Sequence, residues 1–388
     1  MRIAMFNHNI EGFGTYWRCY NLAKALALDG NEVYFFTFSK KIGKKLITIE
    51  KNAKNLTIIK VNAPYRLLRA SIGTIVYSLE FISFIKDLDI VHIFAPAVPP
   101  TGTLLFTINL CKKIVKYAGV NIFLDMDDLW YPPYGFSQEY IEPLRSLSKA
   151  LERYSYKSEI TAITVPTLFL KKIVESLSKS NIPIIRIPNG VPKINLPALI
   201  NRKIYKDVTR ITMIGHTLLK EHFKQILLLI HIVNALTKKL KKVIELHIVS
   251  GNKILASLVK KEEPNVVFHG PKSWSEAIKI LGSSTYAFIP YSSNPIDLAR
   301  WPIRLGDYVA LRKIILASQV SAEPLMLLKA YGCARLIAMY DVHLALKECQ
   351  YLVTKPQEFY HNANFNAFIE KYSWRNIARN LYKIYKVL

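Results

Sequence analysis

The chain has 388 residues, of which 51% are hydrophobic and 21% charged, and this composition indicates a globular protein rather than a disordered one. With 53 Lys+Arg against 28 Asp+Glu, its net charge is +25. Such a basic balance favours a partner rich in phosphate: nucleic acid, an anionic membrane surface or a phosphorylated substrate. The four cysteines form no CxxC pair, so we expect buried thiols in a reducing compartment and neither a disulfide framework nor a zinc ribbon.

The N-terminal residues lack the basic and apolar regions of a secretory signal, and no apolar run reaches the roughly 18–20 residues that span a bilayer. We therefore expect a cytoplasmic protein, either soluble or bound peripherally to the inner face of the cell membrane. Part of the positive charge is concentrated in two stretches. Residues 40–69 contain nine basic side chains and one acid, and residues 201–242 contain ten basic and two acidic ones, so each stretch has a net charge of +8.

Apolar segments of strand length alternate with segments of helix length through the first half of the chain. A glycine-containing loop leads into an amphipathic helix that ends at Gly30. Apolar strands separated by helices predict a parallel sheet covered on both faces. The expected strands lie within residues 2–7, 32–38, 56–62, 89–96, 121–128, 160–167 and 183–190.

A turn at Asn189-Gly190 and an irregular segment after it predict a domain boundary near residues 190–205. The alternation of strands and helices then starts again and ends in an amphipathic helix. The expected strands lie within residues 210–215, 244–251, 265–270, 286–291 and 313–318, and helices within 222–236 and 273–282.

We therefore predict an α/β protein of two Rossmann-like, doubly wound lobes that face each other across a cleft. The first lobe is expected to comprise residues 1–195 and the second residues 205–370. A final helix, residues 371–388, is expected to pack back on the first lobe. Ligands of such folds bind at the carboxyl ends of the strands.

Two candidate loops lie in the first half. The turn Gly12-Phe13-Gly14-Thr15 leads into the first helix, where free backbone N–H groups attract an anion, although it also fits a purely structural turn. A full dinucleotide fingerprint is missing because position 17 is Trp. Asp125, Asp127 and Asp128 follow a strand, where they would chelate a cation or raise one another's pKa values; alternatively, Asp128 caps the next turn and the others are solvated.

Two more candidate loops lie in the second half. Gly215 follows a strand and would let a ligand approach the backbone, while Lys220 lies a few residues on and could meet a diphosphate. Residues 297–308 contain two Asp and two Arg among apolar residues. A carboxylate at a helix start can accept both hydroxyls of a ribose, and Arg304 can pair with a phosphate; a structural ion pair is the alternative.

Taken in order, these segments resemble the GT-B-fold retaining glycosyltransferases of family 4, and the resemblance extends over nearly the whole chain. GFGTYWRCYNLAKALALDGNEV is similar to the family's glycine loop and helix, and ITVPT…IIRIPNGV to its passage into the second lobe. PIRLGDYVALRKIILAS is similar to its variant P-x-K-x-x-E-Y segment, and YSWRNIARNLYKIY to its final helix.

The resemblance implies roles for the positions that match. Asp307 stands at the second glutamate of the family's E-x7-E motif, which binds the ribose; the first falls at Ala299, and Asp297 is a candidate substitute. Arg304 stands at the lysine of P-x-K, and Asp127 replaces a histidine before D-L-W. The expected catalytic residues are Asp127, Arg304 and Lys220. The expected donor-binding residues are Gly14, Gly215, His216, Asp297, Arg304 and Asp307, and the expected acceptor-side residues are Gly12, Thr15 and Arg18.

The implied reaction is sugar transfer from a nucleotide-diphosphate donor, with retention, to a lipid-linked acceptor or a cell-envelope or surface glycan. Backbone N–H groups and cations would stabilise the leaving diphosphate, so neither a cofactor nor a metal is expected. Residues 40–85 combine one basic stretch with an apolar segment, which favours an anionic membrane surface; a core helix beside a solvated loop is the alternative.

Three other functions stay open. A non-catalytic GT-B paralogue is one, because Ala299 and Asp127 depart from the family pattern. A metal-dependent transferase that uses the DxD of Asp125 and Asp127 is another. The third is a basic nucleic-acid-binding protein, but the sequence contains no recognisable nucleic-acid module, so no nucleic-acid partner is expected.

Overall fold

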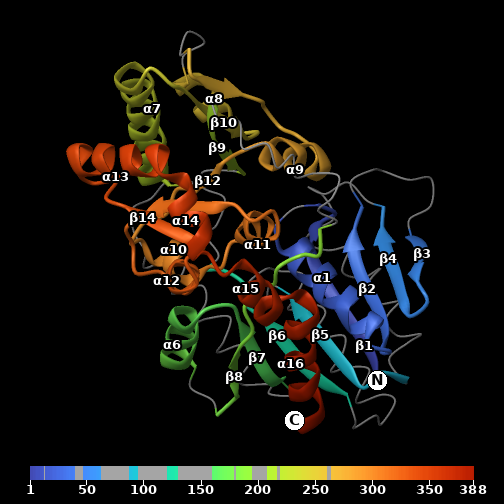
Figure 1. Cartoon of the computed structure of the whole chain (residues 1–388). Helices are drawn as coiled ribbons and strands as arrows, with labels where there is room; N and C mark the ends of the chain where they lie inside the picture. Colours follow the sequence, from blue (N-terminus) through green and yellow to red (C-terminus); the bar gives the residue numbers. More distant parts are fainter. Residues whose placement is uncertain are drawn as a thin grey trace. The chain divides into compact units, whose positions relative to one another are not determined.

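A computed structural model describes most of the chain as two compact units (Figure 1). Unit 1 comprises Met1–Gly190, Ala299–Trp301 and Trp374–Leu388, and unit 2 comprises Val191–Leu298 and Pro302–Ser373. The short segment Ala299–Trp301 therefore groups with unit 1, although it lies inside the range expected for the second lobe. The described residues are 1–12, 14–39, 47–62, 87–94, 120–129, 160–178, 181–194, 208–215, 219–259 and 264–388.

Within the described residues, unit 1 contains a sheet in the strand order β3-β4-β2-β1-β5-β6-β7-β8. Neighbouring strands are parallel except β3 and β4. The core strands are apolar because both faces of the sheet are covered; all of β5 and all but the first residue of β2 are buried. The strands are β1 (Arg2–Ile10), β2 (Glu32–Phe38), β3 (Ile47–Ala53), β4 (Leu56–Val61), β5 (Ile90–Phe94), β6 (Asn121–Asp125), β7 (Ile160–Val165) and β8 (Ile184–Arg186).

Helix α1 (Thr15–Leu28) and helix α16 (Trp374–Val387) pack against each other in unit 1 (Figure 1). The apolar face of α16 is buried, and its opposite face is basic. Arg375 and Arg379 on that face each form an ion pair with Asp29, at 2.9 Å, just beyond the end of α1. Helix α6 (Leu168–Leu177) follows β7 and is capped by the Thr167 hydroxyl. The last helix of the chain thus belongs to the same unit as the first.

Unit 2 contains, within its described residues, a parallel sheet in the order β11-β10-β9-β12-β13-β14. Its strands are β9 (Val208–Ile214), β10 (Val243–Val249), β11 (Val266–Phe268), β12 (Tyr286–Ile289), β13 (Ile314–Ser318) and β14 (Ala334–Ile337). Its helices are α7 (Lys220–Leu240), α8 (Lys253–Leu258), α9 (Trp274–Gly282), α10 (Pro295–Ala299), α11 (Ile303–Ala310), α12 (Glu323–Ala330), α13 (Val342–Thr354), α14 (Pro356–Asn362) and α15 (Phe365–Tyr372). The last residue of α10 is grouped with unit 1.

Both sheets contain six strands in the same Rossmann order, third-second-first-fourth-fifth-sixth, if β3 and β8 at the edges of the first sheet are set aside. The order reverses between β1 and β5 and between β9 and β12, and ligands of such sheets bind at these points beyond the carboxyl ends of the strands. The predicted α/β class of two doubly wound lobes is confirmed. Two strands were not predicted: β3, which is mostly polar and lies at an edge, and β14, which is short and interrupted by Arg335.

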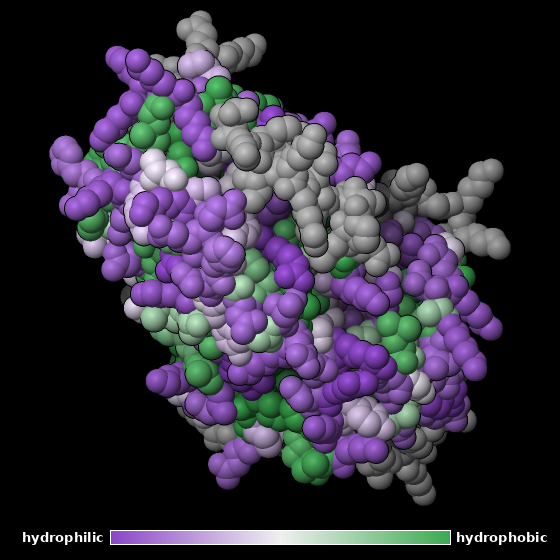
Figure 2. All heavy atoms as spheres, in the orientation of Figure 1, coloured by the Kyte–Doolittle hydropathy of each residue, from purple (hydrophilic) through white to green (hydrophobic). Residues whose placement is uncertain are grey.

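The face drawn in Figure 2 is mainly hydrophilic, in keeping with the high charge of the chain. The described part of the basic stretch 40–69 forms β3 and β4. There Lys60 forms ion pairs with Glu11 at 3.2 Å and Glu50 at 3.0 Å, so its charge is compensated within the protein. The apolar segment of residues 40–85 lies outside the described residues. No helix in the described part of the chain is long and apolar enough to cross a bilayer.

Candidate functional site

In unit 1 the glycine turn after β1 meets the end of β6. The Thr15 hydroxyl, at the start of α1, donates a hydrogen bond of 2.6 Å to Oδ2 of Asp127. The Trp17 indole N–H donates to the carbonyl of Gly12 at 3.0 Å, and Gly14 adopts φ +49° immediately before α1. Three residues expected on the acceptor side or in catalysis therefore lie together: Gly12, Thr15 and Asp127. Burial, assisted by the neighbouring Asp125, raises the pKa of the Asp127 carboxyl to about 6.

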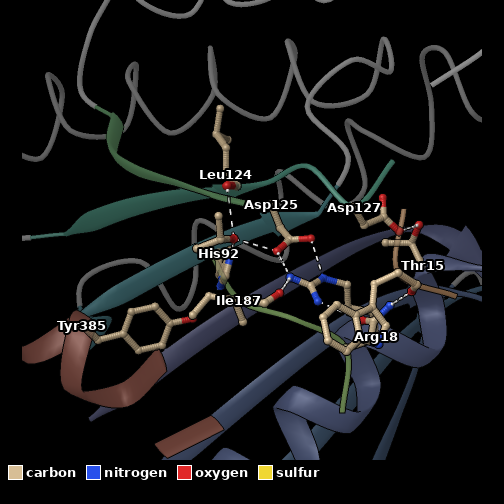
Figure 3. Close-up of polar contacts among 11 residues, drawn as sticks. Thr15, Arg18, His92, Leu124, Asp125, Asp127, Ile187 and Tyr385 are labelled. Carbon is tan, nitrogen blue, oxygen red and sulfur yellow. Dashed lines mark hydrogen bonds and ion pairs between the residues drawn. The ribbon is translucent and has the colours of Figure 1, made fainter. Parts of the chain in front are cut away.

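Arg18 differs from expectation, because its side chain is completely buried. It points toward Asp125 (Figure 3). Its Nε and Nη2 atoms donate to the two carboxylate oxygens of Asp125 at 2.8 and 2.7 Å. Nη2 also donates to the carbonyl of Ile187, and Nη1 to Oδ1 of Asn189, both at 2.8 Å. These four bonds commit the guanidinium to the interior of unit 1. Arg18 therefore holds the chain near Ile187 and Asn189 in place, and its expected role on the acceptor side stays a prediction.

The same bonds bear on the metal hypothesis. Asp125 is fully buried, and both of its oxygens accept hydrogen bonds from Arg18. The Thr164 hydroxyl donates to Oδ2 of Asp125 as well, at 2.6 Å. A carboxylate that is neutralised by a buried guanidinium is a poor cation ligand. The DxD of Asp125 and Asp127 is therefore divided between a structural ion pair and a bond to Thr15.

A chain of buried hydrogen bonds continues from Asp125 to the C-terminal helix (Figure 3). His92 on β5 lies between Thr164, whose Oγ1 is 3.1 Å from Nε2, and Tyr385 on α16, whose hydroxyl is 2.5 Å from Nδ1. Because Thr164 gives its proton to Asp125, Nε2 of His92 must carry the proton that it donates to Thr164. Nδ1 then accepts from Tyr385. Burial lowers the pKa of His92 to about 4, so its ring is neutral near pH 7.

We expect the stabilising effect of His92 to be lost in acid. Its folded-state pKa of about 4 lies below the unfolded value of 6.5, so the contribution is complete above pH 6.5 and disappears as the pH falls toward 4. The difference in unfolding free energy between the wild type and His92→Gln should shrink by about 3 kcal/mol across that range. Urea unfolding of both proteins at several pH values measures it. The carboxyl groups of both proteins titrate alike, so a constant difference would contradict this assignment.

In unit 2 Gly215 and Arg304 lie together at the carboxyl end of β9. Gly215 has φ +113°, and its backbone N–H donates to the carbonyl of Val249 at 2.9 Å. Nη1 of Arg304 donates to the carbonyl of Ile214 at 2.7 Å. A Cβ atom at position 215 would lie 2.3 Å from this Nη1. Only glycine therefore allows the Arg304 guanidinium to lie against the end of β9.

Helix α11 is fastened to the same place by Tyr308. The Tyr308 hydroxyl accepts a hydrogen bond from the backbone N–H of Ile214 at 3.0 Å and donates to the carbonyl of Phe288 at 3.4 Å. Ile214 belongs to β9 and Phe288 to β12. These two strands are neighbours, and the strand order reverses between them. Tyr308 therefore positions Arg304 and Asp307, which lie on the same helix, at the expected ligand-binding edge of the sheet.

Asp307 lies one turn of α11 after Arg304 and is partly buried. Its Oδ1 accepts a hydrogen bond of 3.4 Å from the indole N–H of Trp274, the first residue of α9. Burial raises the pKa of the Asp307 carboxyl to about 7. The expected ribose-binding carboxylate thus lies at the same edge of the sheet as Gly215 and Arg304.

Lys220 is exposed and begins α7, where the positive end of the helix dipole adds to its charge. His216, which was expected to bind the donor, lies outside the described residues. Lys220 and α7 follow β9, so they belong to the same edge of unit 2 as Gly215.

Asp297 is the candidate substitute for the missing glutamate. Its side chain is fully buried, and its Oδ2 accepts from the backbone N–H and hydroxyl of Ser292 at 2.8 and 2.7 Å. Nε2 of His222 lies 2.7 Å from the same oxygen. Ala299 is also buried, and its carbonyl accepts a hydrogen bond from Thr167. The partners of Asp297 in this structure are therefore structural ones, and its contact with the ribose stays a prediction.

Several residues of these clusters were not predicted from the sequence. Nothing in the local pattern distinguishes His92, Thr164 or Tyr385 from ordinary strand and helix residues, because the fold alone brings them together. Tyr308 follows Asp307 directly in α11 and could have been noticed as a polar residue beside the expected ribose-binding carboxylate. Trp274 follows Ser273, the N-cap of α9, so its position at a helix start was visible in the sequence.

No family profile matches the chain, and no curated protein does either. Solved structures do match it. A sucrose-phosphate synthase from Thermosynechococcus elongatus covers 100% of this chain and 98% of its own, with a TM-score of 0.70 at 13% identity. A trehalose-6-phosphate synthase studied for glycosyltransfer with retention covers 100% and 99%, with a TM-score of 0.65 at 11% identity.

A third match is an α,α-trehalose-phosphate synthase (UDP-forming) from Burkholderia xenovorans in complex with glucose-6-phosphate. It covers 99% of each chain, with a TM-score of 0.67 at 8% identity. The chain has a GT-B-like fold. Its structural matches include retaining glycosyltransferases, and they extend along the whole length of both partners. At these identities the likeness establishes the fold, and the chemistry has to be argued from the residues of this chain.

Proposed function

We propose that this protein transfers a sugar from a nucleotide-diphosphate donor to an acceptor with retention of configuration. The observation that carries the proposal is the group of side chains at the carboxyl edge of the unit 2 sheet. There Gly215, Arg304 and Asp307 lie where the strand order reverses, in a chain with a GT-B-like fold. The sequence analysis predicts that the same three residues bind the donor.

The donor would be held by complementary charges and hydrogen bonds. Arg304 and Lys220 supply two cations for the diphosphate, and the N-terminus of α7 adds the positive end of its dipole. Gly215 lets the phosphates approach the backbone. The Asp307 carboxylate would accept hydrogen bonds from the ribose hydroxyls. Together these residues would recognise a nucleoside diphosphate by the charge of its phosphates and by the hydroxyls of its ribose.

The chemical task of these cations is to stabilise the leaving group. As the bond between the donor sugar and the diphosphate breaks, negative charge develops on the phosphate oxygens. Fixed cations and N–H groups at that position lower the barrier, because they need not reorganise during the reaction. Arg304 suits this task, since its position is fixed by Ile214 and by the absence of a side chain at Gly215.

Asp127 and Thr15 are proposed to act on the sugar and acceptor side. Their hydrogen bond fixes the carboxylate at the start of α1 and at the end of β6. With a pKa near 6, Asp127 can accept a proton or a hydrogen bond from a hydroxyl group close to neutral pH. Arg18 serves this site indirectly, because it holds the neighbouring Asp125.

The acceptor is proposed to be a glycan or a lipid-linked sugar at an anionic membrane surface. Residues 40–85 are proposed to bind that surface. The basic and apolar composition of that segment supports this. A cytoplasmic protein on the inner face of the membrane would meet both a nucleotide sugar and such an acceptor.

A nucleotide-binding experiment tests the donor site. Asp307→Ala and Lys220→Ala should each weaken the binding of the nucleoside diphosphate that the wild type prefers among UDP, GDP and ADP by about tenfold. The loss follows from a missing ribose contact in one variant and a missing cation in the other. Isothermal titration calorimetry measures the dissociation constants. Lys238→Ala removes the same charge from the far end of α7 and should bind normally; equal losses in all three variants would contradict the assignment.

A sugar-nucleotide-binding protein without transferase activity is the second candidate. It is favoured by Ala299, which puts a buried methyl group where the family carries a glutamate. Incubating the protein with the sugar nucleotide that it binds separates the two. Hydrolysis by the wild type, in which water takes the sugar and the nucleoside diphosphate is released, and its loss in Arg304→Met support an enzyme, whereas tight binding without hydrolysis supports the second candidate.

A further inference from the structure

Trp274 is exposed to an unusual degree for its type. Its side chain is the first of α9, and 46% of its surface is accessible. Tryptophan is normally well buried because of its large apolar area, so an exposed one on an ordered element is an indication of binding. The position is well defined: Ser273 and Glu276 form a reciprocal capping box that fixes the start of the helix.

The indole is joined to the proposed ribose-binding carboxylate. Nε1 of Trp274 donates to Oδ1 of Asp307 at 3.4 Å, which connects the start of α9 with α11. Within the described residues Oδ2 of Asp307 accepts no hydrogen bond. A ribose could therefore reach Asp307 while the indole keeps its own contact.

The segment between β11 and α9 is short and contains a glycine. Gly270 follows β11, has φ +69°, and a Cβ atom built there would have no neighbour within 4 Å. The strand ends before His269, and the segment runs from Gly270 to Ser273 before Trp274 begins the helix. The backbone of this short segment is thus open at Gly270, four residues before Trp274.

We propose that Trp274 is the platform on which the base of the donor nucleotide stacks. This inference rests on the proposed function, because the position of the base is deduced from that of the ribose, which Asp307 is proposed to bind. The base of a nucleotide is attached to the same sugar ring whose hydroxyls that carboxylate would bind. A side chain that already contacts Asp307 is therefore about one sugar ring away from the base, and the exposed indole is an aromatic group on which a base can stack.

The platform has a defined consequence for specificity. Every base has a π-face, so stacking on an indole strengthens binding of all nucleoside diphosphates without choosing one of them. The choice among nucleoside diphosphates must then come from polar groups around the edge of the base. Stacking contributes nothing to the binding of a diphosphate that has no base.

A merely structural role of Trp274, as a clamp on Asp307, makes a different prediction. Trp274→Phe and Trp274→Leu both lose the indole N–H, so a clamp would be lost equally in both variants. A platform is retained by phenylalanine, which keeps an aromatic face, and is lost with leucine, which has apolar bulk alone. The pair therefore separates the two roles, and both substitutions at an exposed position should leave the fold intact.

Calorimetric titrations of the wild type and both variants with UDP, GDP, ADP and inorganic pyrophosphate test the proposal. We expect Trp274→Leu to weaken the best nucleoside diphosphate about tenfold and Trp274→Phe less than about threefold, with pyrophosphate unchanged. Normal binding by Trp274→Leu, or equal losses in both variants, would overturn the platform and leave the proposed function standing. A wild type that binds pyrophosphate as well as every nucleoside diphosphate would overturn both.

Discussion

Replacing Arg18 by methionine should lower the free energy of unfolding by about 3–5 kcal/mol. The guanidinium is fully buried and supplies four hydrogen bonds, two of them to the carboxylate of Asp125. Methionine fills similar space but leaves the Asp125 charge unpaired in the interior of unit 1. The carbonyl of Ile187 and the amide of Asn189 lose a donor as well. An uncompensated buried charge is among the most costly changes that a single substitution can make.

Urea denaturation measures this loss, and two further variants show whether its cause is the stranded charge. Arg18→Met combined with Asp125→Leu removes both charges and should be more stable than Arg18→Met alone. Arg379→Met breaks an ion pair with Asp29 whose arginine is half exposed, so it should cost less than about 1 kcal/mol. A double variant as unstable as the single one would show that the ion pair is not the source of the loss.

Gly215→Ala should weaken the binding of nucleoside diphosphates about 10- to 100-fold. The added Cβ would lie 2.3 Å from Nη1 of Arg304, and the flexible guanidinium is the group that gives way. Arg304 then leaves the carbonyl of Ile214 and with it the place where the phosphates are proposed to bind. The φ of +113° adds a strain of about 1–3 kcal/mol to the folded state.

Gly30→Ala is the matched control for that strain. Gly30 also has a positive φ, +95°, but a Cβ atom there would meet nothing within 4 Å. It should therefore lose stability like Gly215→Ala and keep its nucleotide affinity. Arg304→Met provides a second check by calorimetry, because the losses of Gly215→Ala and Arg304→Met should not add when both are combined. Additive losses would mean that Gly215 acts independently of Arg304.

The fold could be predicted from the sequence because buried strands and helices require apolar residues in recognisable patterns. Strands such as β2 and β5 lie in the middle of a covered sheet, and their continuous apolar residues identify them without other information. An edge strand has no such requirement. The sequence of β3 contains Glu, Lys and Asn, and most of its residues are at least partly exposed, so its composition resembles that of a loop.

The candidate site could be predicted only in part. Gly215, Arg304 and Asp307 occupy places that a motif marks, and the structure brings them to one edge of a sheet. Asp297 and Arg18 carry charges too, but charge alone does not show whether a side chain faces solvent or the interior. Their partners lie far away in the sequence: Arg18 binds Asp125, 107 residues on, and Asp297 binds His222, 75 residues before it. A sequence pattern does not contain such pairs.

The buried hydrogen bond between His92 and Tyr385 joins residues 293 positions apart, and it has a consequence for the order of folding. During synthesis the β5 strand leaves the ribosome long before α16 is made. The His92 ring in the first sheet therefore lacks its Tyr385 partner until then. Unit 2 consists of residues made before α16 and can assemble during that interval. The protein would then complete its first-made half last, once α16 has been made.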